Sequence, residues 1–317
     1  MSRTDRLAVV AIGGNALFPD ARHLSVRDQY QTIRQLAEHL ADMELDGWRV
    51  LVTHGNGPQV GFVMRRSELA SHEVSPVPMD TAGADLQGGI GYMFVKALHN
   101  SLRRRGIERT PVALITQTLV DAADPAFAAP TKPIGSWMPE AEARKMAAEL
   151  GWTVREDSGR GWRRVVASPL PKAVVEEDAV RAMVEGGFLV VACGGGGIPV
   201  IYNEHGEIEG VEAVIDKDRT SALLARDLGA ELLLLPTGVD RVALDFGTPE
   251  QRWLDSMTVA EAERYIAEGQ FGAGSMEPKI AALVDFVKHG RGEGVIASVP
   301  QMREALEGKA GTRIVRG

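Results

Sequence analysis

An apolar run ends in two glycines and an asparagine at Val9-Val10-Ala11-Ile12-Gly13-Gly14-Asn15-Ala16. This pattern predicts a buried strand that leads into an anion-binding turn. Because glycine lacks a Cβ atom, Gly13 and Gly14 can take positive φ and bring backbone N–H groups close to a charged ligand. Asn15 can then cap the helix that follows.

The same pattern, an apolar run followed by glycines, occurs twice more in the chain. The second copy is Val50-Leu51-Val52-Thr53-His54-Gly55-Asn56-Gly57-Pro58, and the third is Val190-Val191-Ala192-Cys193-Gly194-Gly195-Gly196-Gly197. Three turns of this kind after buried strands indicate that backbone donors converge on a phosphate-bearing ligand.

Composition limits the class of protein. With 317 residues and 44% hydrophobic content, the chain can bury a large core in one domain or two lobes. A net charge of -8 argues against a nucleic-acid-binding surface. The single cysteine, Cys193, excludes an intramolecular disulfide framework, and no four-ligand zinc spacing is present. A polar stretch over residues 1–7 and the lack of a long apolar run predict a cytoplasmic protein without a membrane partner.

Strand and helix patterns alternate along the chain. Apolar, β-branched runs fall near residues 7–12, 48–53, 112–116, 188–193, 231–235 and 294–298. Helical patterns such as Gln29 to Leu45 separate most of them. We therefore predict an α/β fold, a three-layer αβα sandwich with a mainly parallel open sheet and ligands at the carboxyl ends of the strands.

Residues 124–172 interrupt this alternation. The segment contains six prolines and the charged run Arg155 to Arg164. A long surface loop is one interpretation, but Phe127, Trp152 and Trp162 argue against disorder. We expect a small protruding lid subdomain inserted in the main fold.

Three lysines are candidates for phosphoryl-transfer chemistry, which depends mainly on positioning and on neutralising negative charge. Lys217 stands between two carboxylates in Asp216-Lys217-Asp218, before a helical run from Thr220 to Leu228. Asp218 could orient it by accepting its hydrogen bond. A salt-bridged surface turn would give the same pattern.

The other two lysines lie beside glycines and prolines. Lys279 follows Gly272-Ala273-Gly274-Ser275-Met276-Glu277-Pro278, where a helix is expected to begin near Pro278. It could reach nucleotide phosphates or be a solvated lysine at an ordinary helix start. Lys132 is held between prolines in Pro130-Thr131-Lys132-Pro133 inside the expected lid, where a rigid exposed turn is the alternative.

Other polar residues have simpler explanations. His54 could donate to an anion, but a structural role at the end of a strand is favoured. Cys193 lacks a recognisable histidine partner, so a small buried side chain is favoured. Asp80, Asp85 and Gln87 lie near an expected helix N-terminus, and capping explains them. The chain has no Walker phosphate loop, and no Gly-x-Gly-x-x-Gly element follows its first strand.

Taken together, these motifs resemble carbamate kinases, within the amino acid kinase superfamily. The resemblance runs nearly end to end. It is carried by Ile12 to Ala16, Thr53 to Gly61, Pro130 to Gly135, Gly159 to Val166, Cys193 to Val200, Gly210 to Asp218 and Gly274 to Lys279.

The resemblance implies reversible phosphoryl transfer between ADP with carbamoyl phosphate and ATP with carbamate, using Mg²⁺, in a homodimer that generates ATP in arginine or purine catabolism. Within one domain over residues 1–317, residues 1–205 would bind carbamate or carbamoyl phosphate, residues 124–172 would form the lid, and residues 206–317 would bind the nucleotide.

The resemblance also implies a role for each candidate residue. Lys132, Lys217 and Asp218 would be catalytic. The carbamoyl end would bind to Gly13, Gly14, Asn15, Gly55 and Asn56. Nucleotide phosphates would bind to Lys217, Ser275 and Lys279, and the resemblance assigns no protein ligand to the metal.

Two alternatives remain open at this stage. A related kinase could act on another small acid, and the departures from the family pattern at Asp85 and at Ser136-Trp137 leave substrate preference open. A non-catalytic sensor of carbamoyl phosphate or nucleotide is the second alternative, although such a protein need not keep a lid lysine.

Overall fold

The computed structural model describes residues 6–18, 20, 22–157, 159–272 and 274–317. The start of the polar N-terminal stretch, and Ser158 and Ala273 in two of the motifs, therefore lie outside the described residues. None of the helices described is long and apolar enough to cross a membrane.

The described residues form an eight-stranded central sheet in the order β15-β17-β16-β12-β1-β2-β9-β3. Its neighbouring strands pair in parallel, except that β16 and β17 are antiparallel. The bounds are β1 (Leu7–Ile12), β2 (Arg49–His54), β3 (Pro111–Ala113), β9 (Leu189–Val191), β12 (Leu232–Thr237), β15 (Ser256–Thr258), β16 (Glu293–Ser298) and β17 (Thr312–Val315).

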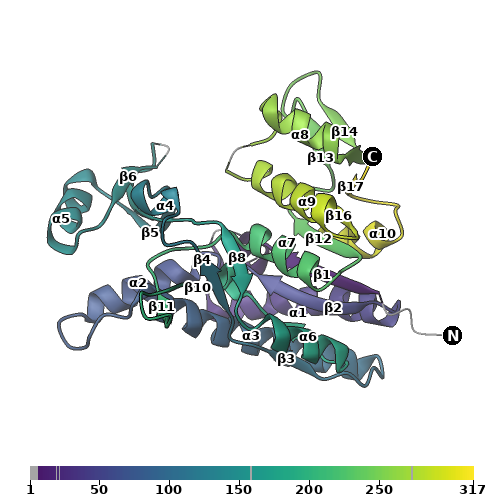
Figure 1. The fold of residues 1–317 in the computed structure, drawn as a ribbon, viewed down its shortest axis with the longest axis horizontal. Coiled ribbons are helices and arrows are strands. Elements are labelled where there is room, and N and C mark those ends of the chain that lie inside the picture. Colours follow the sequence, from purple (N-terminus) through teal and green to yellow (C-terminus); the bar gives the residue numbers. More distant parts are fainter. Residues whose placement is uncertain (1–5, 19, 21, 158, 273) are drawn as a thin grey trace.

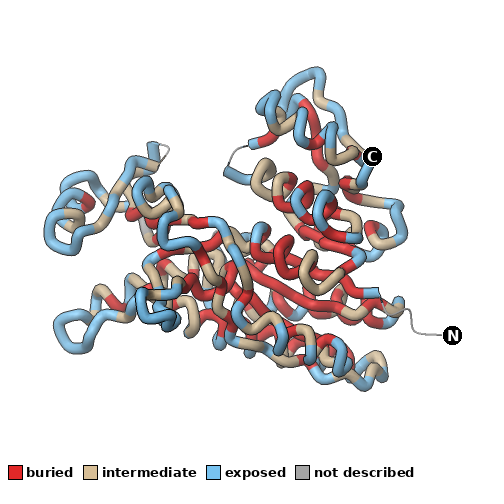
Figure 2. Tube along the Cα trace, viewed as in Figure 1, coloured by how far each residue is buried: buried red, intermediate tan, exposed pale blue. Residues whose placement is uncertain are grey.

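Helices cover both faces of this sheet (Figure 1). One face carries α1 (Val26–Leu45), α3 (Met79–Arg104) and α10 (Met302–Leu306), and the other carries α6 (Glu177–Glu185), α7 (Lys217–Asp227), α8 (Val259–Ala267) and α9 (Glu277–His289). Successive residues of β1 alternate between the two cores: Val9 packs with one and Val10 with the other. The central strands are buried along their length (Figure 2), so the predicted αβα sandwich is confirmed.

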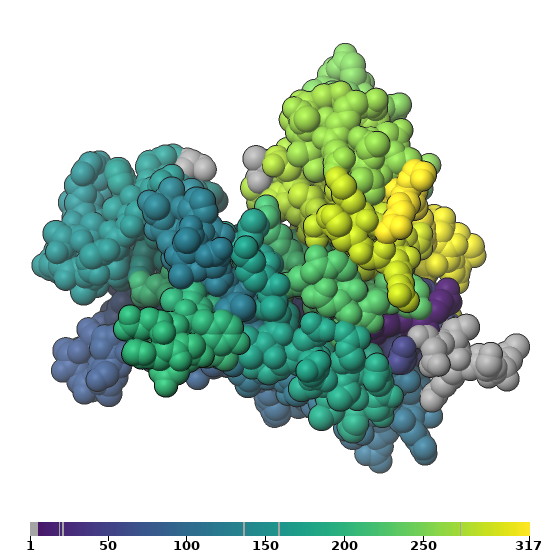
Figure 3. All heavy atoms as spheres, viewed as in Figure 1, coloured from purple at the N-terminus to yellow at the C-terminus, as the bar shows by residue number. Residues whose placement is uncertain are grey.

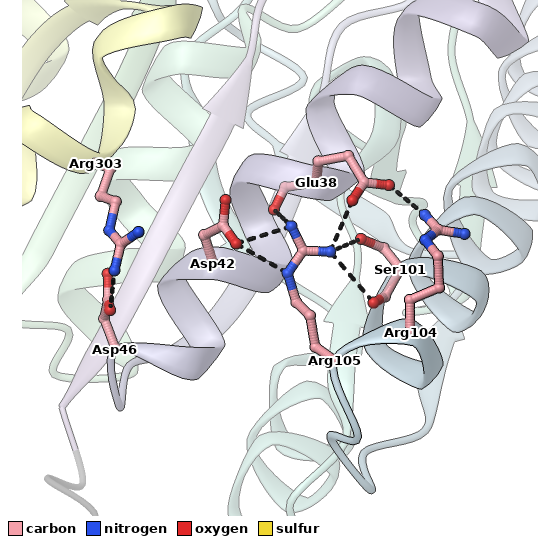
Figure 4. Close-up of polar contacts among 7 residues, drawn as sticks. All are labelled: Glu38, Asp42, Asp46, Ser101, Arg104, Arg105 and Arg303. Atoms are coloured by element: carbon pink, nitrogen blue, oxygen red, sulfur yellow. Dashed lines mark hydrogen bonds and ion pairs between the residues drawn. The ribbon is translucent and has the colours of Figure 1, made fainter.

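Local signals explain where the helices begin. Ser25 and Asp28 form a capping box at the start of α1, three residues before the predicted Gln29. At the far end of this layer, Arg105 donates to Asp42 at 2.8 Å, to Glu38 at 2.7 Å and to Ser101 at 2.8 Å, which ties α3 to α1 (Figure 4).

A second sheet crosses the end of the sandwich in the order β11-β10-β4-β8. Its strands are β4 (Gln117–Val120), β8 (Pro171–Val174), β10 (Ile198–Tyr202) and β11 (Ile208–Gly210). The strand predicted near residues 112–116 is present as β3, but it ends early, at Ala113, and the chain then enters the second sheet as β4. The antiparallel pair β13 (Val242–Leu244) and β14 (Arg252–Leu254) lies in the C-terminal part.

The segment over residues 124–172 is folded. It contains α4 (Pro125–Ala128), β5 (Lys132–Met138), α5 (Glu140–Leu150), β6 (Val154–Glu156) and β7 (Trp162–Val166), with the sheet order β5-β7-β6. Arginine side chains lie over its tryptophan rings, for example Arg164 over Trp152 at 4.8 Å. In Figure 3 this teal part and the yellow-green C-terminal part stand on either side of an open notch.

Candidate functional site

The three glycine turns meet at the carboxyl ends of neighbouring strands. Ile12 at the end of β1 pairs in register with His54 at the end of β2, and β9 lies beside β2. The turns continue as η1 (Gly14–Leu17), as α2 (Gln59–Ala70) and as η2 (Gly194–Gly196). The three turns therefore lie together, while the phosphate-bearing ligand stays a prediction.

Glycine is required at the contacts between these turns. An added Cβ at Gly14 would lie 2.4 Å from the backbone nitrogen of Gly57, so no side chain fits there. Gly195 has a φ of +70°, and an added Cβ would lie 2.3 Å from Nδ2 of Asn56. The Oδ1 atom of Asn56 is buried and accepts no hydrogen bond from the described residues. A buried acceptor without a donor is costly, so this oxygen calls for a functional explanation.

Two expectations about the first turn are wrong. Gly13 has a φ of −63°, and Gly14 is not in the left-handed region, so close approach to Gly57 is the reason for glycine at position 14. Asn15 is exposed within η1 and caps no described helix; the cap of α1 is Ser25.

Two of the candidate lysines share one buried carboxylate. Lys217 is the first residue of α7, not part of a turn before it, and its Nζ binds Asp218 and lies 3.2 Å from the carbonyl oxygen of Ala11. Lys279, in the first turn of α9, binds the other oxygen of Asp218 at 2.8 Å. Asp218 is only 4% exposed, so the alternative of a salt-bridged surface turn is wrong.

The charges of this cluster shift one another's pKa. Burial lowers the pKa of Lys217, with repulsion from Lys279 adding to it, while Asp218 opposes the change. Burial raises the pKa of Asp218, but the charges and hydrogen bonds of both lysines outweigh it and hold this pKa below its usual value. The carboxylate is therefore ionised at neutral pH and fixes both ammonium groups.

Lys132, from the inserted segment, lies beside the cluster formed by Lys217, Asp218 and Lys279. It is the first residue of β5, and its Nζ lies 3.6 Å from Oδ2 of Asp216. Asp216 also caps α7 by accepting from the backbone N–H of Asp218 at 2.9 Å. No role for Asp216 was predicted from the sequence, although an aspartate directly before a helical run is typical of a helix cap.

Among the described residues, no hydrogen bond joins Ser275 to the lysine cluster. It is exposed, and its backbone N–H donates to Gly272 at 3.0 Å within its own turn.

The third glycine turn is held by side chains from three elements. Gln87 donates to the carbonyl oxygens of Thr116 and Gly194, both at 3.0 Å, so its assignment as a helix cap is wrong. Thr118 and Thr220 both donate to the carbonyl oxygen of Gly196 at 2.9 Å. These partners are far apart in sequence, so no local signal pointed to them.

Cys193 and His54, for which structural roles were favoured, are both buried. Cys193 is fully buried, and burial raises the pKa of its thiol to about 12. His54 is 1% exposed and stacks on Phe94. The expected burial of Cys193 is confirmed, and His54 is buried at the end of its strand.

Comparisons with known proteins cover nearly the whole chain. Residues 6–298 match the model of the amino acid kinase family. The chain is 48% identical over 308 residues to a carbamate kinase of Pyrococcus horikoshii, covering 96% of the chain and 98% of that protein. It is also 48% identical over 311 residues to a carbamate kinase of Thermococcus kodakarensis, with 97% and 98% covered. The structure of carbamate kinase from Giardia lamblia bound to AMP-PNP superposes with a TM-score of 0.93 at 36% identity, covering 99% of the chain and 100% of that one.

Proposed function

The chain belongs to the amino acid kinase family, and we propose that it is a carbamate kinase, transferring a phosphoryl group between carbamoyl phosphate and ADP. One observation carries the proposal beyond similarity. Lys132, Lys217 and Lys279 come from three separate elements and meet around Asp216 and Asp218, at the ends of the strands that carry the glycine turns. A cluster of fixed cations and backbone donors is what phosphoryl transfer requires.

The transfer needs no general base in this site. An oxygen of the ADP β-phosphate attacks the phosphorus of carbamoyl phosphate, and the bond from that phosphorus to the carbamoyl oxygen breaks. Carbamate leaves as an anion and decomposes to ammonia and carbon dioxide. Lys132 contacts the transferring group, Lys217 neutralises charge between donor and acceptor, and Lys279 with Ser275 holds the nucleotide phosphates.

The carbamoyl end binds among the first two turns, at Gly13, Gly14, Asn15, Gly55 and Asn56. The buried Oδ1 of Asn56 supports this assignment, because a carbamate amino group can donate the hydrogen bond that this oxygen lacks. A carboxylate such as acetate has no N–H in that position, so Asn56 also favours carbamate over other small acids.

The donor set fits a magnesium ion carried by the nucleotide. No group of three or more His, Cys, Asp or Glu side chains is placed to hold a metal among the described residues. Magnesium commonly binds through substrate phosphates and one or two carboxylates, and Asp216 is the residue that would supply one. The ion would add to the neutralisation of phosphate charge.

The remaining parts of the proposal concern the whole molecule. Residues 124–172 act as a lid that brings Lys132 to the phosphoryl group, residues 1–205 bind the carbamoyl substrate, and residues 206–317 bind the nucleotide. The protein works as a homodimer in the cytoplasm and generates ATP in arginine or purine catabolism.

The test is ATP formation from ADP, Mg²⁺ and carbamoyl phosphate, compared with a reaction without enzyme because carbamoyl phosphate decomposes spontaneously. We expect rapid ATP production that collapses in Lys132→Ala. The matched control is Lys145→Ala on α5 of the same inserted segment, which should stay active because its contact is to Glu149 on the same helix. Binding of both ligands without any turnover would favour a sensor, and turnover with a different acid would favour a diverged kinase.

A further inference from the structure

The imidazole of His54 lies between two of the glycine turns. It stacks on Phe94 of α3 with ring centroids 5.7 Å apart. Its Nδ1 is 3.1 Å from the carbonyl oxygen of Gly55. On the other side, an added Cβ at Gly194 would lie 2.6 Å from the ring Nε2. The ring therefore contacts the second and third turns together.

The protonation of this ring follows from its surroundings. Burial lowers the pKa of His54 to about 4, and the charge of Lys217 contributes in the same direction. The ring is neutral near pH 7 and carries one proton. Because the carbonyl oxygen of Gly55 can only accept, that proton sits on Nδ1.

The carbonyl group of Gly55, which His54 binds, lies at the centre of the site. The backbone N–H of Gly55 donates to Ile12 at 2.9 Å, so both polar groups of this residue are engaged. An added Cβ at Gly55 would lie 2.8 Å from the nitrogen of Gly14 and 3.6 Å from Cδ of Lys217. Rotation of the Gly55 carbonyl would disturb the packing of Gly55 on Gly14 and Lys217 and would shift Asn56, the next residue, relative to the first turn.

We propose that His54 is a positioning residue for phosphoryl transfer: its Nδ1–H fixes the Gly55 carbonyl, and thereby holds Gly55 against Gly14 and Lys217 and sets the direction of Asn56, the next residue. This inference rests on the proposed function, since the step affected is the transfer itself. Loss of the donor should lower kcat and raise the KM for carbamoyl phosphate. The KM for ADP should change little, because Lys279 lies outside these contacts.

Three variants separate the hydrogen bond from packing. His54→Asn keeps an N–H donor near the position of Nδ1, His54→Gln moves its donor toward the position of Nε2, and His54→Leu has none. We expect kcat within about fivefold of the unaltered protein for His54→Asn, and losses of about 100-fold for the other two, as misplacement of a catalytic group produces. Packing alone predicts the reverse order, because asparagine leaves the most space beside Phe94.

Ser101→Ala is the matched control. Ser101 is fully buried on the same helix as Phe94, but it bonds Arg105 at the far end of that helix (Figure 4). This variant should lose stability without a change in kcat. If His54→Asn is as inactive as His54→Leu at equal folded fraction, the positioning role is refuted.

Nitrogen NMR of labelled histidine gives a readout independent of turnover. The resonances missing from the spectrum of His54→Asn belong to His54, and they should show a protonated Nδ1 and an unprotonated Nε2 between pH 5.5 and 8. The opposite tautomer would overturn the proposal. If the unaltered protein makes no ATP, the proposed function is refuted. The tautomer measured by NMR still tests the hydrogen bond from Nδ1 of His54 to Gly55, independently of turnover.

Discussion

Asp218→Asn tests the organisation of the lysine cluster most directly. The carboxylate is 4% exposed and accepts from Lys217 with one oxygen and from Lys279 with the other, the latter at 2.8 Å. An asparagine amide can accept from one lysine only, and its NH₂ group then faces the other ammonium. Removing one partner of a buried ion pair lowers the free energy of unfolding by roughly 3–5 kcal/mol. Because both lysines keep some contact with water, we expect a loss near the lower end, about 3 kcal/mol in the free energy of unfolding.

Activity should fall more sharply than stability. Removing one preorganised donor from a site that stabilises developing negative charge costs about 10²–10³ in kcat. The pH profile should also move. Asp218 raises the pKa of Lys217 against burial, so its loss lowers that pKa further. A lysine loses its charge as pH rises through its pKa, so the variant's activity should decline at lower pH than that of the unaltered protein.

The assay is ATP formation at saturating ADP and carbamoyl phosphate over a range of pH, with urea unfolding on the same samples. Asp227→Asn is the control, because it makes the same chemical change at the other end of α7, where Asp227 pairs with Arg226 at 2.8 Å. Its kcat should match the unaltered protein. A kcat for Asp218→Asn within about threefold of this control would refute the reasoning, since a fixed pair of lysines would then be unnecessary.

Three further predictions concern residues in the second and third glycine turns. Gly195→Ala should lower kcat/KM for carbamoyl phosphate at least about tenfold, because the new Cβ displaces Asn56. Gly187→Ala is the control: its φ is also positive, at +86°, but the space around it is open. Both variants should lose about 1–2 kcal/mol in the free energy of unfolding, and Gly187→Ala should show no other effect. Cys193, with its raised pKa, should not react with Ellman's reagent at pH 8 until the protein is unfolded, and stoichiometric reaction of active protein would contradict its burial. His54 takes up its proton near pH 6.5 when unfolded and near 4 when folded, so stability should fall as pH drops through this window; urea unfolding should show a fall of up to about 3 kcal/mol that His54→Asn lacks.

The sequence predicted the centre of the sheet well, because its strands are buried on both faces. The predicted strands at residues 7–12 and 294–298 correspond to β1 and β16 within one residue. The sequence did not predict the short strands of the inserted segment, where Trp162 to Val166 alternates only partly and contains two arginines. Partners such as β5 and β7 define each other as strands, and a single sequence does not show that pairing.

The site was predicted where its chemistry is local. Lys217 and Asp218 are adjacent, so their pairing could be anticipated. Gln87 was misassigned because its partners, Thr116 and Gly194, lie in other strands and turns, and only the folded chain brings them together. The pairing of Lys279 with Asp218 was invisible for the same reason.

The three lysines of the cluster are held with different strengths, and this bears on which of them moves. Lys217 and Lys279 are mostly buried against Asp218, so separating them from it is expensive. Lys132 is 41% exposed and lies 3.6 Å from Asp216, a contact that contributes about 0–1 kcal/mol. A phosphoryl oxygen can therefore replace Asp216 as the partner of Lys132 at little cost in free energy, while Lys217 and Lys279 stay bound to Asp218. Asp216→Asn, which retains the cap of α7, should accordingly leave the free energy of urea unfolding nearly unchanged, while ATP formation changes through Lys132 and through the Mg²⁺ that Asp216 is proposed to bind.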